Sequence, residues 1–263
     1  AAEYGIATEG RGKDAVALEL AKAVYAEFGK QEGFLQFTRR APQKRVDQWR
    51  KMGIDPRGID REIVEIMHRT HMGVDNGWQS LLLHGLRNAL SDGWGGSMVA
   101  TEISDILFGT PTPIAVDVNM GVLKEDQVNV IVHGHEPNMF ESMLVSVNEP
   151  TLVQAAKDAG AEGINLVGMC CSGAEMMSRH GVPHAGNFMS TEAVLVTGAV
   201  DAMAVDVQCI KQGLAKVAEC YGTILVTTNP RCHIEGTKHI EFHEHDPKAS
   251  TDEIVIQAIG RFK

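Results

Sequence analysis

The stretch Val128-Asn129-Val130-Ile131-Val132-His133-Gly134-His135 indicates the fold most directly. It begins with a short, almost continuous apolar run and ends in two histidines. Three more apolar runs follow along the chain, at residues 163–167, 202–207 and 223–226. Strands that are apolar along their whole length are typical of a parallel sheet that is covered on both faces.

Helical patterns separate these apolar runs. They lie at residues 151–159, 174–179, 191–200 and 210–220. Pro150 stands just before the first of them, where the first turn of a helix tolerates proline. Because strands alternate with helices, we predict a doubly wound, Rossmann-like α/β domain over residues 114–263.

The first 113 residues show a different spacing of apolar side chains. Apolar residues three and four positions apart predict helices at residues 14–28, 63–67, 81–90 and 98–107. The glycine-rich segment 92–96 (DGWGG) predicts a loop between the last two helices. Thr110-Pro111-Thr112-Pro113 then interrupts the helical pattern. We therefore predict a helical domain over residues 1–113 in front of the α/β domain.

Composition narrows the class of protein. The 263 residues are 44% hydrophobic and 22% charged, as in a globular chain. The formal net charge of −10 disfavours nucleic-acid binding, because phosphate contacts need a basic face. No apolar run reaches the ~20 residues that a membrane-spanning helix needs, and no signal peptide is visible, so we expect a cytoplasmic protein. Since the chain begins at Ala1 and not at Met, we expect it to be part of a longer one.

The chain contains five cysteines, which are Cys170, Cys171, Cys209, Cys220 and Cys232. An odd number of cysteines without an export signal predicts reduced thiols and not a disulfide framework. Cys220 lies in a helical pattern, and we expect it in the hydrophobic core.

Metal-ligating side chains follow three of the apolar runs. His133 and His135 come after the first run, Cys170 and Cys171 after the second, and Cys209 after the third. The carboxyl ends of the strands form the ligand-binding edge of an open parallel sheet, so we expect these side chains to lie near one another. Imidazole and thiolate suit zinc, copper, nickel or iron–sulfur clusters, and not magnesium or calcium. The sequence therefore predicts a metal centre shared between the strand ends.

Two other interpretations compete with this metal centre. Cysteine is among the most buried residue types, so these thiols also fit the core of a metal-free α/β scaffold or binding domain. A zinc hydrolase is a further alternative, with Glu136 or Glu175 as its general base. The sequence has no Cys-x-x-Cys, Gly-x-Gly-x-x-Gly or Walker A motif, so local spacing indicates neither a conventional iron–sulfur cluster nor a nucleotide site.

At these strand ends the sequence resembles the catalytic subunit of the nickel–iron carbon monoxide dehydrogenases. The resemblance rests on residues 132–137 (VHGHEP), 167–175 (VGMCCSGAE) and 206–210 (DVQCI). Residues 92–98 (DGWGGSM) and 121–126 (GVLKED) support it, and it extends over nearly the whole chain. The fold it implies is the one that these enzymes share with the hybrid-cluster proteins.

The resemblance implies a catalytic nickel–iron–sulfur cluster of the Ni-4Fe-4S type. His135 and Cys171 match the residues that hold the iron outside the cubane, and Cys209 matches a thiolate ligand of the cubane. Asp92 is a weaker candidate, as a proton acceptor or a group that supports the site, and no role is assigned to His133 or Cys170. The remaining ligands, an active-site lysine and additional [4Fe-4S] clusters are expected outside this sequence.

The activity implied by the resemblance is the reversible, anaerobic oxidation of carbon monoxide with water to CO2, two protons and two electrons. The expected partners are a second copy of the subunit, a ferredoxin-type electron carrier, and acetyl-CoA synthase or a hydrogenase. Through such partners the resemblance also allows a peripheral location at the inner face of the membrane. The alternative family is the hybrid-cluster oxidoreductases, which act on nitrogen oxides or hydroxylamine and which nickel content distinguishes. We expect the 263 residues to be inactive on their own.

Overall fold

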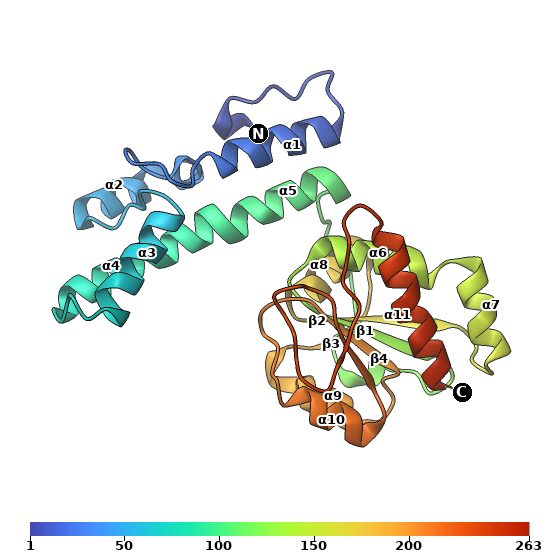
Figure 1. Cartoon of the computed structure of the whole chain (residues 1–263). Coiled ribbons are helices and arrows are strands. Elements are labelled where there is room, and N and C mark those ends of the chain that lie inside the picture. Colours follow the sequence, from blue (N-terminus) through green and yellow to red (C-terminus); the bar gives the residue numbers. More distant parts are fainter. Residues whose placement is uncertain (263) are drawn as a thin grey trace. The chain divides into compact units, whose positions relative to one another are not determined.

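The computed structural model describes residues 1–262 and divides into two compact units, Ala1–Thr110 and Pro111–Lys263 (Figure 1). The boundary predicted from the sequence falls after Pro113, whereas the two units divide after Thr110. None of the described helices is both long enough and apolar enough to cross a membrane.

The second unit is built around a parallel sheet that has six strands within the described residues. The strands are β1 (Val128–Gly134), β2 (Ile164–Met169), β3 (His184–Gly186), β4 (Ala202–Val205), β5 (Ile224–Thr227) and β6 (Lys238–His239). Their order is β3-β2-β1-β4-β5-β6, which is the strand order of a doubly wound Rossmann fold. Each strand pairs in parallel with its neighbours. The fold class predicted from the apolar runs is therefore confirmed.

Helices cover both faces of the sheet (Figure 1). They are η4 (Met120–Val122), α6 (Pro137–Val147), α7 (Pro150–Asp158), α8 (Cys170–His180), η5 (Phe188–Ser190), α9 (Thr191–Val196), α10 (Leu214–Tyr221) and α11 (Pro247–Phe262). Val130 and Val132 of β1 pack into one core with α6, α8 and α11, while Ile131 packs into a second core with α9 and α10. All seven residues of β1 are buried, because this central strand has a core on each side.

The sequence predictions missed the two edge strands, β3 and β6, and the helices α6 and α11. The edge strands have three and two residues, which is too short for a hydrophobic period to be recognised. Cys220 was predicted in the core, and that prediction is wrong. It lies in α10 but is exposed, because the buried face of this helix is formed by Leu214 and Ala218.

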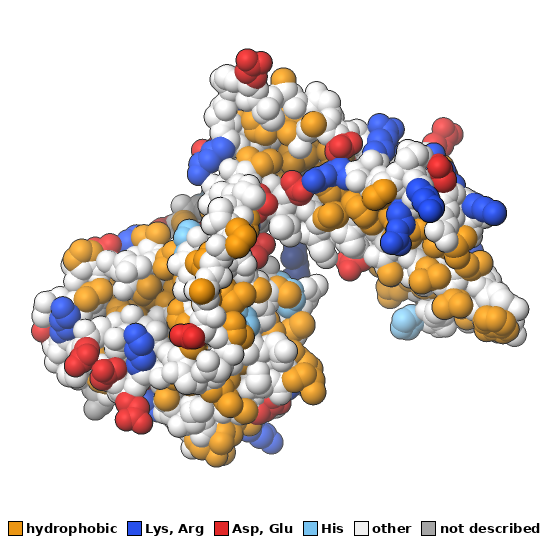
Figure 2. Space-filling view, turned by 180° about the vertical axis from the view of Figure 1, so that it is seen from behind, with side chains coloured by type: hydrophobic (Ala, Val, Ile, Leu, Met, Phe, Trp, Pro, Cys, Tyr) orange, Lys and Arg blue, Asp and Glu red, His pale blue; other side chains and the backbone are white. Residues whose placement is uncertain are grey.

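The first unit is helical. Its elements are η1 (Ala2–Tyr4), α1 (Lys13–Tyr25), η2 (Gln36–Arg40), α2 (Gln43–Met52), α3 (Asp60–His71), α4 (Trp78–Ser91), η3 (Asp92–Ser97) and α5 (Met98–Phe108). Many large apolar side chains on α3 and α4 are exposed, including Val64, Met67 and Trp78, and Figure 2 shows hydrophobic side chains gathered over this unit.

The glycine-rich loop predicted at residues 92–96 is wrong. The segment forms the π-helical stretch η3, which runs without a break from α4 into α5. Its glycines all have negative φ, so they are not needed for a turn. Gly95 is needed for close packing, because a Cβ atom there would lie 2.6 Å from Cγ1 of Ile59 and 3.0 Å from Cδ2 of Leu35.

A buried ion-pair network holds α3 to α4. The carboxylate of Glu62, which is fully buried, accepts hydrogen bonds from Arg57 at 2.9 Å and from Arg87 at 2.7 Å. His84 is also buried, with Nε2 3.3 Å from the Glu62 carboxylate. Burial raises the pKa of Glu62, but the hydrogen bonds of Arg57 and the charge of Arg87 outweigh it and lower this pKa from 4.5 to about 2.

We expect Glu62→Gln to destabilise the helical unit by about 3 kcal/mol, because it leaves buried arginine charge without its partner. Since the folded-state pKa is lowered, Glu62 contributes stability above pH 4.5 that is lost as the pH falls toward about 2. Amide hydrogen exchange of α3 and α4 in the whole protein measures this local stability. The matched control is Glu102→Gln, which breaks an exposed pair with Arg40 and should cost less than about 1 kcal/mol. Equal effects of the two variants would contradict the prediction.

Candidate metal centre

The candidate ligands meet at the carboxyl ends of three adjacent strands. His135 follows β1, Cys171 is the second residue of α8 directly after β2, and Cys209 follows β4. Nε2 of His135 lies 3.8 Å from Sγ of Cys209. His135 is partly buried, whereas Cys171 and Cys209 are exposed. The side chains therefore lie at the edge where an open parallel sheet binds ligands.

The backbone orients the imidazole of His135. Its Nδ1 lies 3.0 Å from the carbonyl oxygen of Val207, which is a hydrogen-bond acceptor. Nδ1 must therefore carry the proton, and Nε2 on the Cys209 side keeps its lone pair. Histidines that bind metals are usually oriented by such a bond from the other ring nitrogen.

The carboxylate of Asp206 connects the turns that follow β1 and β4. This fully buried carboxylate accepts the backbone N–H groups of His135 at 2.7 Å and Glu136 at 2.8 Å, and also that of Val207. The hydroxyl of Ser172 in α8 donates to the same carboxylate at 3.3 Å. Burial raises the pKa of Asp206, although the backbone N–H groups and His135 act in the opposite direction.

Left-handed backbone conformations are concentrated at this edge. Cys170, Gln208 and Cys209 have φ angles of 58°, 61° and 52°, and they are the non-glycine residues with positive φ among those described. Such a conformation costs about 1–3 kcal/mol for a residue with a side chain, and strain of this kind is concentrated at functional sites. The two cysteine-bearing turns are therefore built at a cost that the packing of the sheet offsets.

The thiols of the site lie close enough to affect one another's ionisation. Burial raises the pKa of Cys170 to about 11, and the charges of Cys209 and Cys171 add to the effect. Burial also raises the pKa of Cys171, again with a contribution from Cys209. A cationic metal centre beside these thiols would favour their thiolate forms instead.

The donor set fits a metal cluster better than a single ion. One imidazole and two thiols form the soft set that suits iron–sulfur and nickel chemistry. Within the described residues, these three side chains do not form a group whose donor atoms all lie within 4.8 Å of one another. A single tetrahedral zinc needs such closeness, whereas the ligands of a cluster bind different metal atoms. The zinc hydrolase alternative has no support from this geometry.

One group of residues does have donor atoms that all lie within 4.8 Å of one another, but it lies in the helical unit. It consists of Glu62, Glu65 and His84. Both carboxylates are already bonded to arginines, namely Arg57 and Arg87. The arginine charges neutralise the carboxylates and disfavour a cation there, so we assign the group to the structural network described above.

The sequence also singled out His133, Cys170 and Asp92, whose surroundings differ from those of the three candidate ligands. His133 is fully buried, and neither ring nitrogen has a hydrogen-bond partner among the described residues. Burial lowers the pKa of His133 to about 4, so the ring is neutral near pH 7. Cys170 is buried next to the candidate ligand Cys171. Asp92 is exposed and begins η3 in the helical unit, not in the unit that carries His135, Cys171 and Cys209.

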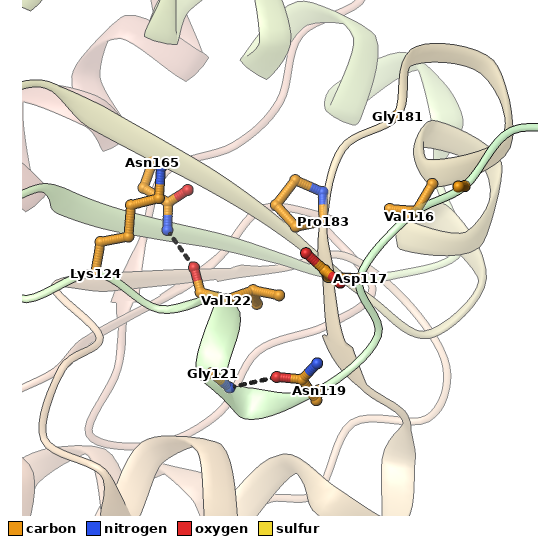
Figure 3. A pocket seen from close by; sticks show the side chains of 10 residues that line it. Val116, Asp117, Asn119, Gly121, Val122, Lys124, Asn165, Gly181 and Pro183 are labelled. Carbon is orange, nitrogen blue, oxygen red and sulfur yellow. Dashed lines mark hydrogen bonds between the residues drawn. The ribbon is translucent and has the colours of Figure 1, made fainter.

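A pocket near the amino ends of the strands is not part of this centre (Figure 3). Two hydrogen bonds join groups of its lining. The amide of Asn165, near the start of β2, donates to the carbonyl oxygen of Val122 at 2.9 Å, and the backbone N–H of Gly121 donates to Asn119. Neither histidine nor cysteine is found in its lining. The pocket therefore gives no support to a second catalytic centre.

Asp206 and His184 belong to the surroundings of the site but were not predicted from the sequence. Asp206 lies only three positions before Cys209 in the segment DVQC, and that proximity was an available signal. His184 lies on an edge strand that was not predicted, and no local pattern connects it to the cysteines. Its contacts arise only when β3 pairs with β2.

The comparisons with known proteins are consistent over the whole chain. The Prismane/CO dehydrogenase family model matches residues 1–263. Carbon monoxide dehydrogenase 1 of Methanosarcina mazei is 55% identical over 262 residues, which cover 100% of this chain and 42% of that protein. The carbon monoxide dehydrogenase/acetyl-CoA synthase subunit beta of Moorella thermoacetica is 39% identical over 262 residues, with 98% of this chain and 38% of that protein covered.

A solved structure agrees with these relatives. The Ni-free carbon monoxide dehydrogenase from Thermococcus sp. AM4 matches with a TM-score of 0.93 and 48% identity, over 99% of this chain and 42% of that one. This chain thus spans about two fifths of the length of these relatives. The resemblance predicted from the strand ends is confirmed, and the chain belongs to the Prismane/CO dehydrogenase family.

Proposed function

We propose that this chain is part of an enzyme that oxidises carbon monoxide with water to CO2, two protons and two electrons. The observation that carries the proposal is the meeting of His135, Cys171 and Cys209 at one sheet edge. Its second support is the 55% identity to a protein named carbon monoxide dehydrogenase. Because the chain spans only 42% of that relative, the activity is proposed for the whole enzyme.

In this proposal, Nε2 of His135 and the sulfurs of Cys171 and Cys209 hold part of a nickel–iron–sulfur cluster. When bound, such a cluster supplies a metal that binds carbon monoxide, a metal that lowers the pKa of water, and a store for two electrons. The ligand roles of the three residues rest on their soft donor atoms and on their common place at the strand ends.

The residues around the ligands keep them in place. The Val207 carbonyl fixes the tautomer of His135, so that the Nε2 lone pair is available to a metal. Asp206 holds the turns after β1 and β4 through backbone N–H groups. Asp92, which begins η3 in the helical unit, is proposed as a proton acceptor of the whole enzyme on the sequence resemblance alone.

The proposal extends to partners of the whole enzyme. We propose a homodimer that carries additional [4Fe-4S] clusters, passes electrons to a ferredoxin-type carrier and works anaerobically in the cytoplasm. Acetyl-CoA synthase is a proposed partner, because the name of the Moorella thermoacetica relative joins the two activities.

The proposal is tested on the full-length native enzyme, purified without oxygen. Nickel, iron and zinc per chain are measured together with dye reduction by carbon monoxide and with hydroxylamine reduction. Nickel with an excess of iron, and dye reduction that depends on carbon monoxide, is the expected result. Iron without nickel, together with hydroxylamine reduction, would favour a hybrid-cluster enzyme. A folded, metal-free protein would indicate a scaffold domain.

A further inference from the structure

His184, the first residue of β3, is buried behind the turn that carries Cys170 and Cys171. The backbone N–H of Gly186 donates to its Nδ1 at 3.2 Å, so Nδ1 carries the lone pair. The proton of the neutral ring must then be on Nε2, which lies 3.1 Å from the carbonyl oxygen of Cys170. His184 therefore donates a hydrogen bond to the cysteine that precedes the ligand Cys171.

This hydrogen bond acts on a turn that has little freedom. Cys170 has a φ of 58°, a conformation that is strained for a residue with a side chain. On the other side, Gly168 and Gly173 touch so closely that a Cβ atom on Gly168 would lie 2.6 Å from Cα of Gly173. A Cβ atom on Gly173 would lie 2.9 Å from Cδ2 of His184. The turn is thus closed by the glycine pair and held by the imidazole.

Different side chains support the turns after β1 and β4 and the turn after β2. Asp206 accepts backbone N–H groups from the turns after β1 and β4, which carry His135 and Cys209. Its link to the turn after β2 is the bond from Ser172 at 3.3 Å. The backbone of that turn pairs with the end of β1 through the bridge between Cys170 and Gly134, and the carbonyl of Cys170 accepts the hydrogen bond of His184.

We propose that His184 is a positioning residue that holds the strained Cys170 carbonyl and thereby directs Sγ of Cys171 toward the metal cluster. The inference rests on the proposed function, because it takes Cys171 as a cluster ligand. A histidine with a merely structural role in the core would affect the stability of β3, and any loss of metal would only follow a loss of folded protein.

The test uses three variants of the full-length enzyme, purified without oxygen. His184→Phe keeps a ring of similar size but has no donor. His184→Asn has a donor that is too short to reach the Cys170 carbonyl, whereas the amide nitrogen of His184→Gln can take the place of Nε2. The control is His180→Phe, an exposed histidine at the end of α8 that contacts Glu141 instead of the turn.

The readouts are nickel and iron per folded chain, the melting temperature and the exchange of backbone amides in the turn after β2. We expect His184→Phe and His184→Asn to lower nickel per chain by about 10-fold and to speed up amide exchange in the turn. His184→Gln and His180→Phe should stay within about twofold of the unchanged enzyme, since neither removes the hydrogen bond.

Wild-type metal content in both His184→Phe and His184→Asn would overturn the inference, as would equal losses in His184→Gln and His184→Asn. If His184→Phe does not fold, the comparison of His184→Asn with His184→Gln tests the inference instead. Metal content is measured without a substrate, so these results are distinguishable from a failure of the proposed activity. That failure would appear as a nickel-loaded, unchanged enzyme that does not oxidise carbon monoxide.

Discussion

Replacing Cys171 by Ala in the full-length enzyme is expected to abolish the oxidation of carbon monoxide, with a loss of about 100-fold or more. Removal of a residue that only orients a metal ligand typically costs 10–100-fold in affinity or activity, and loss of the ligand itself should cost at least as much. Cys171 is exposed, so its truncation opens no cavity in the core and the fold should persist. Metal per chain and activity are measured on the same preparation, together with the melting temperature.

Cys220→Ala is the matched control for this prediction. Cys220 is also an exposed cysteine of the same unit, but it lies on α10, away from the strand ends. It should therefore leave both metal content and activity unchanged. A Cys171→Ala enzyme that keeps its metal and its activity would show that Cys171 is not a ligand. The scaffold interpretation of these thiols would then be favoured.

Gly134→Ala is expected to disturb the metal centre about as strongly as Cys171→Ala, but for a steric reason. Gly134 ends β1 with a φ of 150°, a conformation that residues with a side chain rarely adopt. A Cβ atom there would lie 1.6 Å from Oδ1 of Asp206, so the carboxylate would have to move. Since that carboxylate holds the backbone N–H groups of His135, Glu136 and Val207, the turns that carry two of the ligands would be released.

We expect Gly134→Ala to lower the free energy of unfolding by about 4 kcal/mol, as backbone strain and overpacking add together. Gly163→Ala, just before β2, is the control, because it has ordinary φ and no atom within 4 Å of the added Cβ. Melting temperature, nickel and iron are compared for the two full-length variants. A Gly134→Ala enzyme with the melting temperature and metal content of the Gly163→Ala control would contradict this account of Asp206.

The fold of the α/β unit could be predicted from the sequence because its central strands are buried on both faces. That burial requires nearly continuous apolar runs, and the runs that became β1, β2, β4 and β5 were all recognised. The carboxyl ends of adjacent parallel strands meet at one edge, so His135, Cys171 and Cys209 could be named as a group before any coordinates were known.

The helical unit was predicted less completely, because its packing depends on contacts between distant segments. Gly95 was predicted as part of a glycine-rich loop, but it lies inside a helical stretch, where an added Cβ would collide with Leu35 and Ile59. Glu62 and His84 are polar residues that are usually exposed, and only the arginines supplied by other segments allow their burial.

The sequence by itself therefore determined the class of fold, and it predicted the edge of the sheet where the candidate ligands meet and the chemical type of those ligands. These features follow from local patterns, which are the run of apolar residues and the residue types directly after each strand. The tertiary structure alone decided what holds those ligands. The carboxylate of Asp206 and the imidazole of His184 act on backbone groups of other segments. Such bonds exist only after the strands have paired, and no spacing along the chain encodes them.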